Sequence, residues 1–407
     1  MATERLDTVL QAELDALRQT GADKGAERVV TDVIGAAGSR GPRVRLEGEG
    51  TREFMRMNSN SYLGLGLNER LKAASEAAVM RFGTGPGAVR FISGTHEPHV
   101  QLEAALAKFH GREAGMLMSS AYATMVSVIV PLTTKQTAIV SDELNHNCII
   151  NAIRLSRPQA KFIYRHLDLD DLRAKLVSAV ESGAKRCLVV TDGIFSMRGV
   201  HAPLGELSAV LDGFRDAFDE DLILITDDSH GVAAVGATGR GTEELTGAAV
   251  SDVLVGTLGK GFGVNGGYVV GSSTLIAYLR ETSMMYIYSN PVTPGEAAAG
   301  LESVRLVDSP EGAELLKRVR HNSERFRSGL ADAGLETLPG QHPVVPLMVR
   351  DTARTNGLVR RLFEEGVLAT GLAFPVVPRG DESIRFQLAA DHTEADVDLV
   401  LGLLRHG

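Results

Sequence analysis

Short apolar runs that end in polar residues or glycine recur from about residue 58 to residue 290. Segments with apolar residues at helical spacing separate them. Four of the runs predict strands: AIV at 138–140, CLVV at 187–190, LILI at 222–225 and VLV at 253–255. Uniformly apolar strands are typical of parallel sheets that are buried on both faces. The alternation of strands and helices therefore predicts an α/β fold with a mainly parallel, doubly wound sheet.

The N-terminal stretch has a different pattern. Apolar residues recur at helical spacing over residues 6–17 and predict a helix. Residues 21–50 are polar and rich in glycine, and they predict an arm that leads into the fold.

The order of elements changes again toward the C-terminus. A long helical region over 294–333 is followed by a strand at 344–349, a helix near 356–365 and a strand at 384–388. Residues 393–396, Thr-Glu-Ala-Asp, are typical of a capping box that opens a final helix. This α+β order predicts a smaller C-terminal domain. Together the patterns predict three segments: an N-terminal helix and arm over 1–57, a large domain over 58–293 and a small domain over 294–407.

Composition argues against several classes of protein. Lys plus Arg number 42 and Asp plus Glu 51, so the net charge of −9 argues against binding to nucleic acid or to an anionic membrane. No apolar run approaches the roughly 18 residues that span a bilayer. The acidic N-terminus lacks the apolar core of a signal peptide, so we expect a cytoplasmic protein. Glycine is in excess, with 44 residues, and we expect it where the backbone turns tightly or approaches other groups closely.

A lysine among glycines follows the predicted strand at 253–255, in Gly-Thr-Leu-Gly-Lys-Gly-Phe-Gly (256–263). A phosphate-binding P-loop does not fit, because Walker A needs four residues between its glycines and Ser or Thr after the lysine. Two interpretations of Lys260 remain: a nucleophile that forms a Schiff base with an aldehyde cofactor, or a surface lysine in a turn.

Polar residues also follow the strand at 222–225, in Thr-Asp-Asp-Ser-His-Gly (226–231). Asp227 at a strand end could bind a metal, cap a helix or pair with a cationic ring nitrogen, and lone Asp or His residues at such places are often structural. The carboxyl ends of parallel strands meet at one edge of the sheet, so Asp227, His230 and Lys260 are expected near each other. Pyridoxal 5′-phosphate (PLP) needs this combination, an amine for its aldehyde and an acid for its pyridine nitrogen.

At the level of whole motifs, the chain resembles the α-oxoamine synthases, PLP enzymes of fold type I related to 2-amino-3-ketobutyrate CoA ligase and 8-amino-7-oxononanoate synthase. The resemblance extends over about residues 25 to 405. Eight motifs carry it: Asn-Ser-Tyr-Leu-Gly-Leu (60–65), Arg-Phe-Ile-Ser-Gly-Thr-His (90–96), Ser-Asp-Glu-Leu-Asn-His (141–146), Thr-Asp-Gly-Ile-Phe-Ser-Met (191–197), Asp-Asp-Ser-His-Gly (227–231), Gly-Arg-Gly (239–241), Thr-Leu-Gly-Lys-Gly-Phe-Gly (257–263) and Ile-Arg-Phe (384–386).

The resemblance implies four catalytic residues. Lys260 matches the lysine that forms the Schiff base and removes the proton from the substrate Cα. Asp227 matches the partner of the pyridine nitrogen, and His146 matches the histidine that stacks on the ring. His230 matches the histidine that bonds the ring 3′-oxygen and takes part in acyl transfer.

The other implied residues bind the cofactor or the substrates. Contacts to cofactor and phosphate are expected from Ser120, Ala121, Tyr122, Asp192, Ser196 and Thr257, and across a dimer interface from Ser289 and Asn290. Substrate contacts are expected from Asn60 and from Arg385, which would clamp the amino-acid carboxylate. No metal site is expected.

The reaction that the resemblance implies is a C-acyl transfer by a homodimer with its active site at the subunit interface. An α-amino acid would condense with an acyl-CoA thioester, releasing CoA and CO2 and giving an α-aminoketone. Two alternatives stay open: a glycine C-acetyltransferase that does not decarboxylate, and another chemistry on the same fold, such as transamination.

One departure from the family motifs bears on substrates. Arg198 follows Phe-Ser-Met where relatives commonly carry an acid. It is predicted to pair with a second carboxylate on the amino acid or acyl chain, or with CoA phosphates; the alternative is a solvated surface arginine. His99 and Glu103 are interpreted as a helix start rather than metal ligands, and Cys148 as a small buried hydrophobic residue.

Overall fold

The computed structural model describes residues 3–405. Two compact units divide the chain. The larger comprises Asn60–Arg320 with Gly340–Pro343, and the smaller comprises the described residues up to Ser59, His321–Pro339 and those from Val344 on. The three-segment division expected from the sequence stays a prediction.

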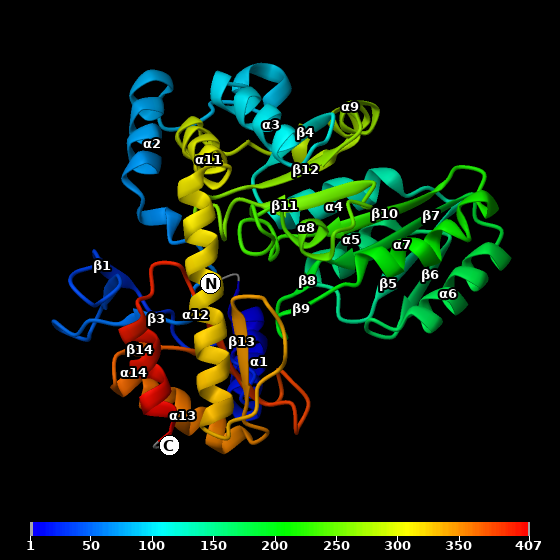
Figure 1. The fold of residues 1–407 in the computed structure, drawn as a ribbon. Helices are drawn as coiled ribbons and strands as arrows, with labels where there is room; N and C mark the ends of the chain where they lie inside the picture. Colours follow the sequence, from blue (N-terminus) through cyan, green and yellow to red (C-terminus); the bar gives the residue numbers. More distant parts are fainter. Residues whose placement is uncertain (1–2, 406–407) are drawn as a thin grey trace. The chain divides into compact units, whose positions relative to one another are not determined.

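A seven-stranded sheet forms the centre of the larger unit, in the order β4-β12-β11-β10-β7-β5-β6 (Figure 1). Only β12 runs against its neighbours, so the predicted mainly parallel sheet is confirmed. The four predicted strands lie within β5, β7, β10 and β11. The strand bounds are β4 Ala114–Met118, β5 Thr137–Asp142, β6 Ala160–Tyr164, β7 Arg186–Asp192, β10 Leu222–Asp227, β11 Val253–Thr257 and β12 Gly267–Gly271.

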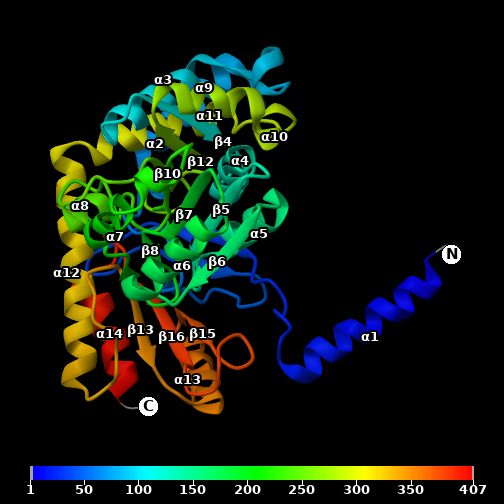
Figure 2. The same ribbon diagram turned by 90° about the vertical axis from the view of Figure 1, so that its right-hand side faces the viewer.

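Both faces of this sheet are buried, as the apolar runs predict. In β7, Leu188 and Val190 pack into one core cluster, whereas Cys187 and Val189 pack into another. Helices cover the two faces (Figures 1 and 2). The first cluster includes side chains of α4 Ala121–Leu132, α5 Asn147–Ser156 and α9 Ser273–Thr282, and the second those of α6 Leu169–Glu181 and α7 Leu204–Asp212.

The remaining elements of this unit lie around the β4 end of the sheet or in its loops. Helix α11 packs against α2 and α3 (Figure 1). The region predicted as one helical stretch over 294–333 is two helices, because Pro310 opens a second one. The bounds are α2 Glu69–Phe82, α3 Glu97–Phe109, β8 Ile194–Phe195, β9 Val200–His201, α8 Thr242–Thr246, α10 Met284–Ile287 and α11 Pro294–Val307. The second helix, α12 Pro310–Asp332, begins in this unit and ends in the smaller one.

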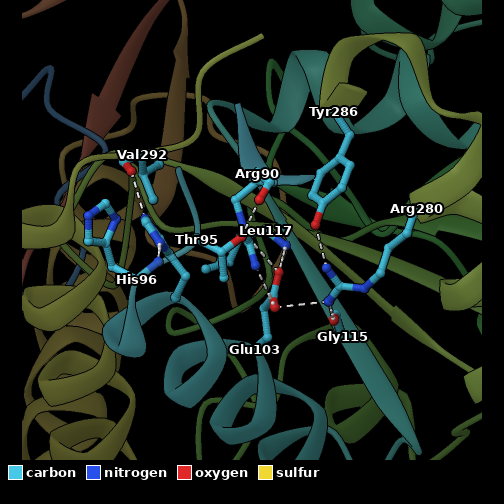
Figure 3. Close-up of polar contacts among 10 residues, drawn as sticks. Arg90, Thr95, His96, Glu103, Gly115, Leu117, Arg280, Tyr286 and Val292 are labelled. Carbon is cyan, nitrogen blue, oxygen red and sulfur yellow. Dashed lines mark hydrogen bonds and ion pairs between the residues drawn. The ribbon is translucent and has the colours of Figure 1, made fainter. Parts of the chain in front are cut away.

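A buried carboxylate ties the segment at 90–94 to this framework (Figure 3). Glu103 accepts two hydrogen bonds from Arg90, each 3.0 Å, and one from Arg280 at 2.9 Å. The Leu117 backbone N–H donates to the same carboxylate at 2.9 Å. Tyr286 on α10 accepts a hydrogen bond from Arg280 at 2.5 Å. Glu103 therefore links α3 to the 90–94 segment, β4 and α9, and Arg280 extends the network to α10.

The predicted helix start at His99 is also confirmed. Helix α3 begins at Glu97, and the His96 backbone N–H donates to Nδ1 of His99 at 2.9 Å. The Nε2 atom donates to the carbonyl of Val292 at 2.8 Å, because a carbonyl can only accept. Burial lowers the pKa of His99, which fits a neutral ring held by two backbone groups.

A three-stranded antiparallel sheet, in the order β13-β16-β15, organises the smaller unit. Phe326 and Phe386 stack edge-on in its core at 5.0 Å between ring centroids. The strands and helix predicted at 344–349, 356–365 and 384–388 are present. The bounds are β1 Val30–Ile34, β2 Arg43–Leu46, β3 Met55–Arg56, β13 Val344–Met348, α13 Thr352–Glu364, β14 Val367–Leu368, β15 Thr370–Leu372, β16 Ser383–Gln387 and α14 Glu394–Arg405.

The C-terminal and N-terminal helices both match the predictions from their sequence patterns. The capping box of α14 is formed: Asp396 N–H donates to Thr393 Oγ1 at 3.1 Å, and Thr393 N–H donates to Asp396 Oδ2 at 3.0 Å. The N-terminal helix, α1 Glu4–Thr20, includes the predicted range, and none of its side chains is buried. Within residues 3–405, no helix combines the length and apolar character needed to cross a bilayer.

Candidate active site

Side chains with the predicted chemistry follow the carboxyl ends of neighbouring parallel strands. Asp227 ends β10 and Asp192 ends β7, and the two are direct register partners. His146 follows β5 and caps α5. Lys260 comes three residues after the last residue of β11, Thr257. Strand polarity alone therefore brings these groups to one edge of the sheet.

A pocket at this edge collects eight of the predicted site residues. Three further residues of the described chain also line it: Cys148, Ile194 and Ser229. The predicted residues that line it are Ala121, Tyr122, His146, Asp192, Ser196, Asp227, His230 and Lys260.

His146 is held as a neutral ring. Its Nδ1 accepts the backbone N–H of Cys148 at 3.2 Å, so the neutral imidazole carries its proton on Nε2. Its own backbone N–H donates to Asp192 Oδ2 at 3.0 Å. Burial lowers the pKa of His146, and the charge of Lys260 lowers it further, against the opposing effect of Asp227.

Asp227 and Asp192 have different surroundings. Asp227 accepts the Ser229 backbone N–H at 3.1 Å and the Cys148 thiol at 3.5 Å. Burial raises the pKa of Asp192 well above its ordinary value, and the neighbouring Asp227 raises it further. Asp192 therefore takes up a proton more readily than an ordinary aspartate does. Burial also raises the pKa of the Cys148 thiol, which agrees with the interpretation of Cys148 as a buried, unreactive residue.

His230 is anchored by two residues for which the sequence predicted no role: Tyr62, within the motif at 60–65, and His342. The Tyr62 hydroxyl lies 2.7 Å from its Nδ1 and 3.2 Å from Asn60 Oδ1. His342 Nε2 lies 2.8 Å from the His230 carbonyl oxygen. Tyr62 and His342 are separated from His230 by more than a hundred positions in the chain. No local spacing could have indicated these contacts.

The start of α4 forms one wall of the pocket. Ser120 caps the helix, with its Oγ accepting the Ala123 N–H at 3.1 Å. A side chain on Gly267 would lie 2.3 Å from Ala121 N, so only glycine lets β12 pass this helix end. The N–H groups of a helix N-terminus favour an anion such as a phosphate.

These residues fit PLP. The pocket offers an amine for an aldehyde in Lys260, a carboxylate for a cationic ring nitrogen in Asp227, and a helix N-terminus for a phosphate. In addition, the Ser229 hydroxyl lines the pocket and is buried without a hydrogen-bond partner in the described part of the chain. Such an orphaned buried group is expected where a polar ligand belongs.

Comparison with known proteins places this geometry in a family. The model of the class I and II aminotransferases matches residues 52–404. The chain belongs to this family. Within it, the chain is 39% identical to an 8-amino-7-oxononanoate synthase of Geobacter metallireducens over 393 residues, 96% of each chain. It is 38% identical to the synthase of the same name from Thermosipho melanesiensis over 351 residues, covering 86% of this chain and 87% of that one.

Solved structures agree with this placement. A serine palmitoyltransferase of Sphingomonas wittichii has a TM-score of 0.87 at 26% identity and covers 99% of this chain and 97% of its own. At 23% identity, a serine palmitoyltransferase of S. paucimobilis solved with bound PLP has the same fold, with a TM-score of 0.86 over 99% of this chain and 97% of its own. The resemblance to α-oxoamine synthases, the fold type, the PLP cofactor and the acyltransferase class are thereby confirmed.

In this member of the class I and II aminotransferase family, the other predicted residues lie outside the described lining of the pocket. Ser120 directly precedes Ala121, and the Thr257 hydroxyl donates to the Gly266 carbonyl at 3.1 Å. Arg198 is exposed in the turn between β8 and β9. The loop between α10 and α11 holds Ser289 and Asn290; Asn60 contacts Tyr62, and Arg385 lies on β16 of the smaller unit. The roles of all these residues stay predictions.

Proposed function

We propose that this pocket condenses an α-amino acid with an acyl thioester, releases the thiol and CO2, and yields an α-aminoketone. The observation that carries the proposal is the gathering of Lys260, Asp227, His146 and His230 around one pocket at the carboxyl edge of the sheet. The names of the relatives support it, because 8-amino-7-oxononanoate bears an amine and a ketone on adjacent carbons.

Each catalytic group has one task in this proposal. When bound, PLP supplies an electron sink for negative charge at the amino-acid Cα. The Lys260 amine takes the Cα proton, as a positioned base beside the reacting carbon. The Asp227 carboxylate would hold a proton on the ring nitrogen through the charge–charge attraction of a buried site. The His146 ring, whose pKa is lowered by burial, would stack on the cofactor ring without adding charge to it.

The bonds of the overall reaction balance. The Cα of the amino acid bonds to the acyl carbon, the carbon–sulfur bond breaks, and the thiol leaves with a proton. The bond from Cα to the carboxyl carbon then breaks, and its electron pair is protonated at Cα. His230 donates a hydrogen bond to the acyl oxygen, where charge develops during the attack.

The substrate pair is tested by incubating the holoenzyme with amino acids and acyl-CoAs in pairs, while free thiol and CO2 are measured. Equal amounts of both products are expected with the correct pair. Thiol release without CO2 would favour a glycine C-acetyltransferase type of reaction. A keto acid formed from the amino acid without thiol would mean transamination and would overturn the proposal.

We also propose a homodimer in which the loop after α10 approaches the neighbouring subunit's pocket. Large apolar side chains are exposed where α10 lies beside the 90–94 segment: Phe91 is 67% and Tyr288 73% exposed. Ser289 and Asn290 follow this patch directly. Apolar patches of this kind mark protein interfaces. A cytoplasmic location remains a prediction from the sequence.

The dimer is tested by measuring mass in solution by light scattering. The wild type is expected at twice the 43.4 kDa chain mass. Phe91→Asp should shift the mass toward one chain, whereas Val177→Asp, at an exposed apolar position on α6, should not. A monomeric wild type would contradict the proposal.

A further inference from the structure

Two buried side chains behind the pocket hold His230, at its ring and at its backbone. Tyr62 is 0% and His342 1% exposed, and neither lines the pocket. Tyr62 lies 2.7 Å from His230 Nδ1, and His342 lies 2.8 Å from the His230 carbonyl oxygen. The two rings contact each other edge-on, with 5.1 Å between centroids and an 81° interplanar angle. The phenol therefore has little freedom to turn away from His230.

The protons in this cluster can be assigned from the chemistry of the acceptors. A carbonyl only accepts, so His342 Nε2 carries a proton and donates to His230. The Tyr62 hydroxyl has one proton, and the acceptors near it include His230 Nδ1 at 2.7 Å and Asn60 Oδ1 at 3.2 Å. The imidazole nitrogen is nearer and far more basic than an amide oxygen, so it receives the proton.

We propose that Tyr62 is a positioning residue that keeps the proton of neutral His230 on Nε2. With Nδ1 occupied as an acceptor, the ring presents an N–H donor to the pocket instead of a lone pair. This inference rests on the proposed function, in which His230 donates to the acyl oxygen. If the phenol proton went to Asn60, Nδ1 would carry the His230 proton and Nε2 would be an acceptor, which cannot stabilise an oxyanion.

The test uses a variant that removes one oxygen atom and its proton. Tyr62→Phe keeps the ring that packs against His342 and removes the donor to His230. The chain offers a matched control in Tyr268, a fully buried tyrosine whose hydroxyl lies 2.8 Å from His110 Nε2 and which does not line the pocket. Tyr268→Phe removes an equally buried tyrosine–histidine hydrogen bond elsewhere in the same unit.

The first measurement is nitrogen NMR of apoenzyme labelled with ¹⁵N-histidine, with the His230 signals identified by their loss in His230→Gln. Wild-type His230 is expected to be protonated on Nε2 with Nδ1 as a hydrogen-bonded acceptor. In Tyr62→Phe the Nδ1 resonance should shift, and a second form protonated on Nδ1 should appear. A wild-type ring protonated on Nδ1 would overturn the inference, even if the variant failed to fold. Unchanged His230 signals in a folded Tyr62→Phe would also overturn it.

The second measurement is steady-state kinetics of the holoenzyme. Tyr62→Phe should lower kcat about 10- to 100-fold with KM values little changed, the range seen when a partner that orients an active-site histidine is lost. Tyr268→Phe should keep kcat near that of the wild type. Equal losses of kcat in the two variants would mean that Tyr62 only packs in the core, and would overturn the inference. Because the NMR measurement needs no substrate, failure of the proposed reaction and failure of this inference give different results.

Discussion

At the scale of single residues, the site depends on two neighbouring aspartates that have different hydrogen-bond partners and different proposed roles. Asp192 and Asp227 end adjacent strands in register, and both are buried. Two carboxylates this near each other cannot both ionise freely. Burial and the charge of Asp227 raise the pKa of Asp192, which favours its neutral form. In the proposed function, Asp227 is the partner for the cofactor ring.

This division predicts unequal effects of two matched amide substitutions. Asp227→Asn removes the charge opposite the ring nitrogen and should lower kcat about 10²- to 10⁴-fold. Asp192→Asn replaces a neutral acid by a neutral amide that can still accept the His146 N–H, so kcat should stay within about tenfold. Steady-state kinetics of both variants checks this. Equal losses would show that Asp192 also acts as a charged group.

At the scale of elements, the Glu103 network fixes the position of the 90–94 segment. The Arg90 side chain is 3% and that of Glu103 7% exposed, so both ions have left bulk water. A buried ion pair adds little net stability compared with apolar packing, but loss of one partner leaves an uncompensated charge. The network therefore makes the sequence at these positions hard to change.

Glu103→Gln is predicted to lower the free energy of unfolding by about 3–5 kcal/mol, because Arg90 and Arg280 both lose their counter-ion. Denaturant titration at fixed protein concentration measures this change. Glu311→Gln, in an exposed pair with Arg70, is the control and should have a much smaller effect. A small effect of Glu103→Gln would mean that the network is not needed for stability.

Elements were predictable where burial imposes a simple pattern. The runs at 187–190 and 222–225 are apolar at every position because β7 and β10 are covered on both faces, so sequence alone indicated a parallel sheet. Strand β6 lies at the edge of the sheet and alternates between exposed and less exposed positions. It was not predicted, because it lacks a continuous apolar run. The site followed from strand ends and family motifs. The anchoring of His230 by Tyr62 and His342 did not, because contacts across such long separations have no local signature.

At the scale of the whole molecule, buried histidines make stability depend on pH. Burial is the main cause that lowers the pKa of His99, His146, His110 and His392. The pKa of His110 falls to about 3, with the charges of Arg112 and Arg240 adding to the effect of burial. The unfolded chain binds the proton near pH 6.5 and the folded chain only near pH 3, so stability falls as the pH drops through this window.

His110→Gln should remove this contribution. Between pH 6.5 and pH 3, the free energy of unfolding of the wild type should fall more steeply than that of the variant, by about 1.4 kcal/mol per pH unit. Denaturant titrations across this range measure the two slopes. Exposed His201→Gln is the control and should keep the wild-type slope. Parallel curves for wild type and His110→Gln would contradict the effect of burial on His110.

The proposed condensation of an amino acid with an acyl thioester depends on the Lys260 amine. The most direct measurement is simultaneous release of thiol and CO2 from an amino acid and an acyl-CoA, compared between wild type, Lys260→Ala and the exposed control Lys135→Ala. We predict equal amounts of both products from wild type and control, and a loss of at least about a thousandfold in Lys260→Ala. Release of thiol and CO2 by Lys260→Ala at the wild-type rate would contradict the proposed role of Lys260 in the condensation.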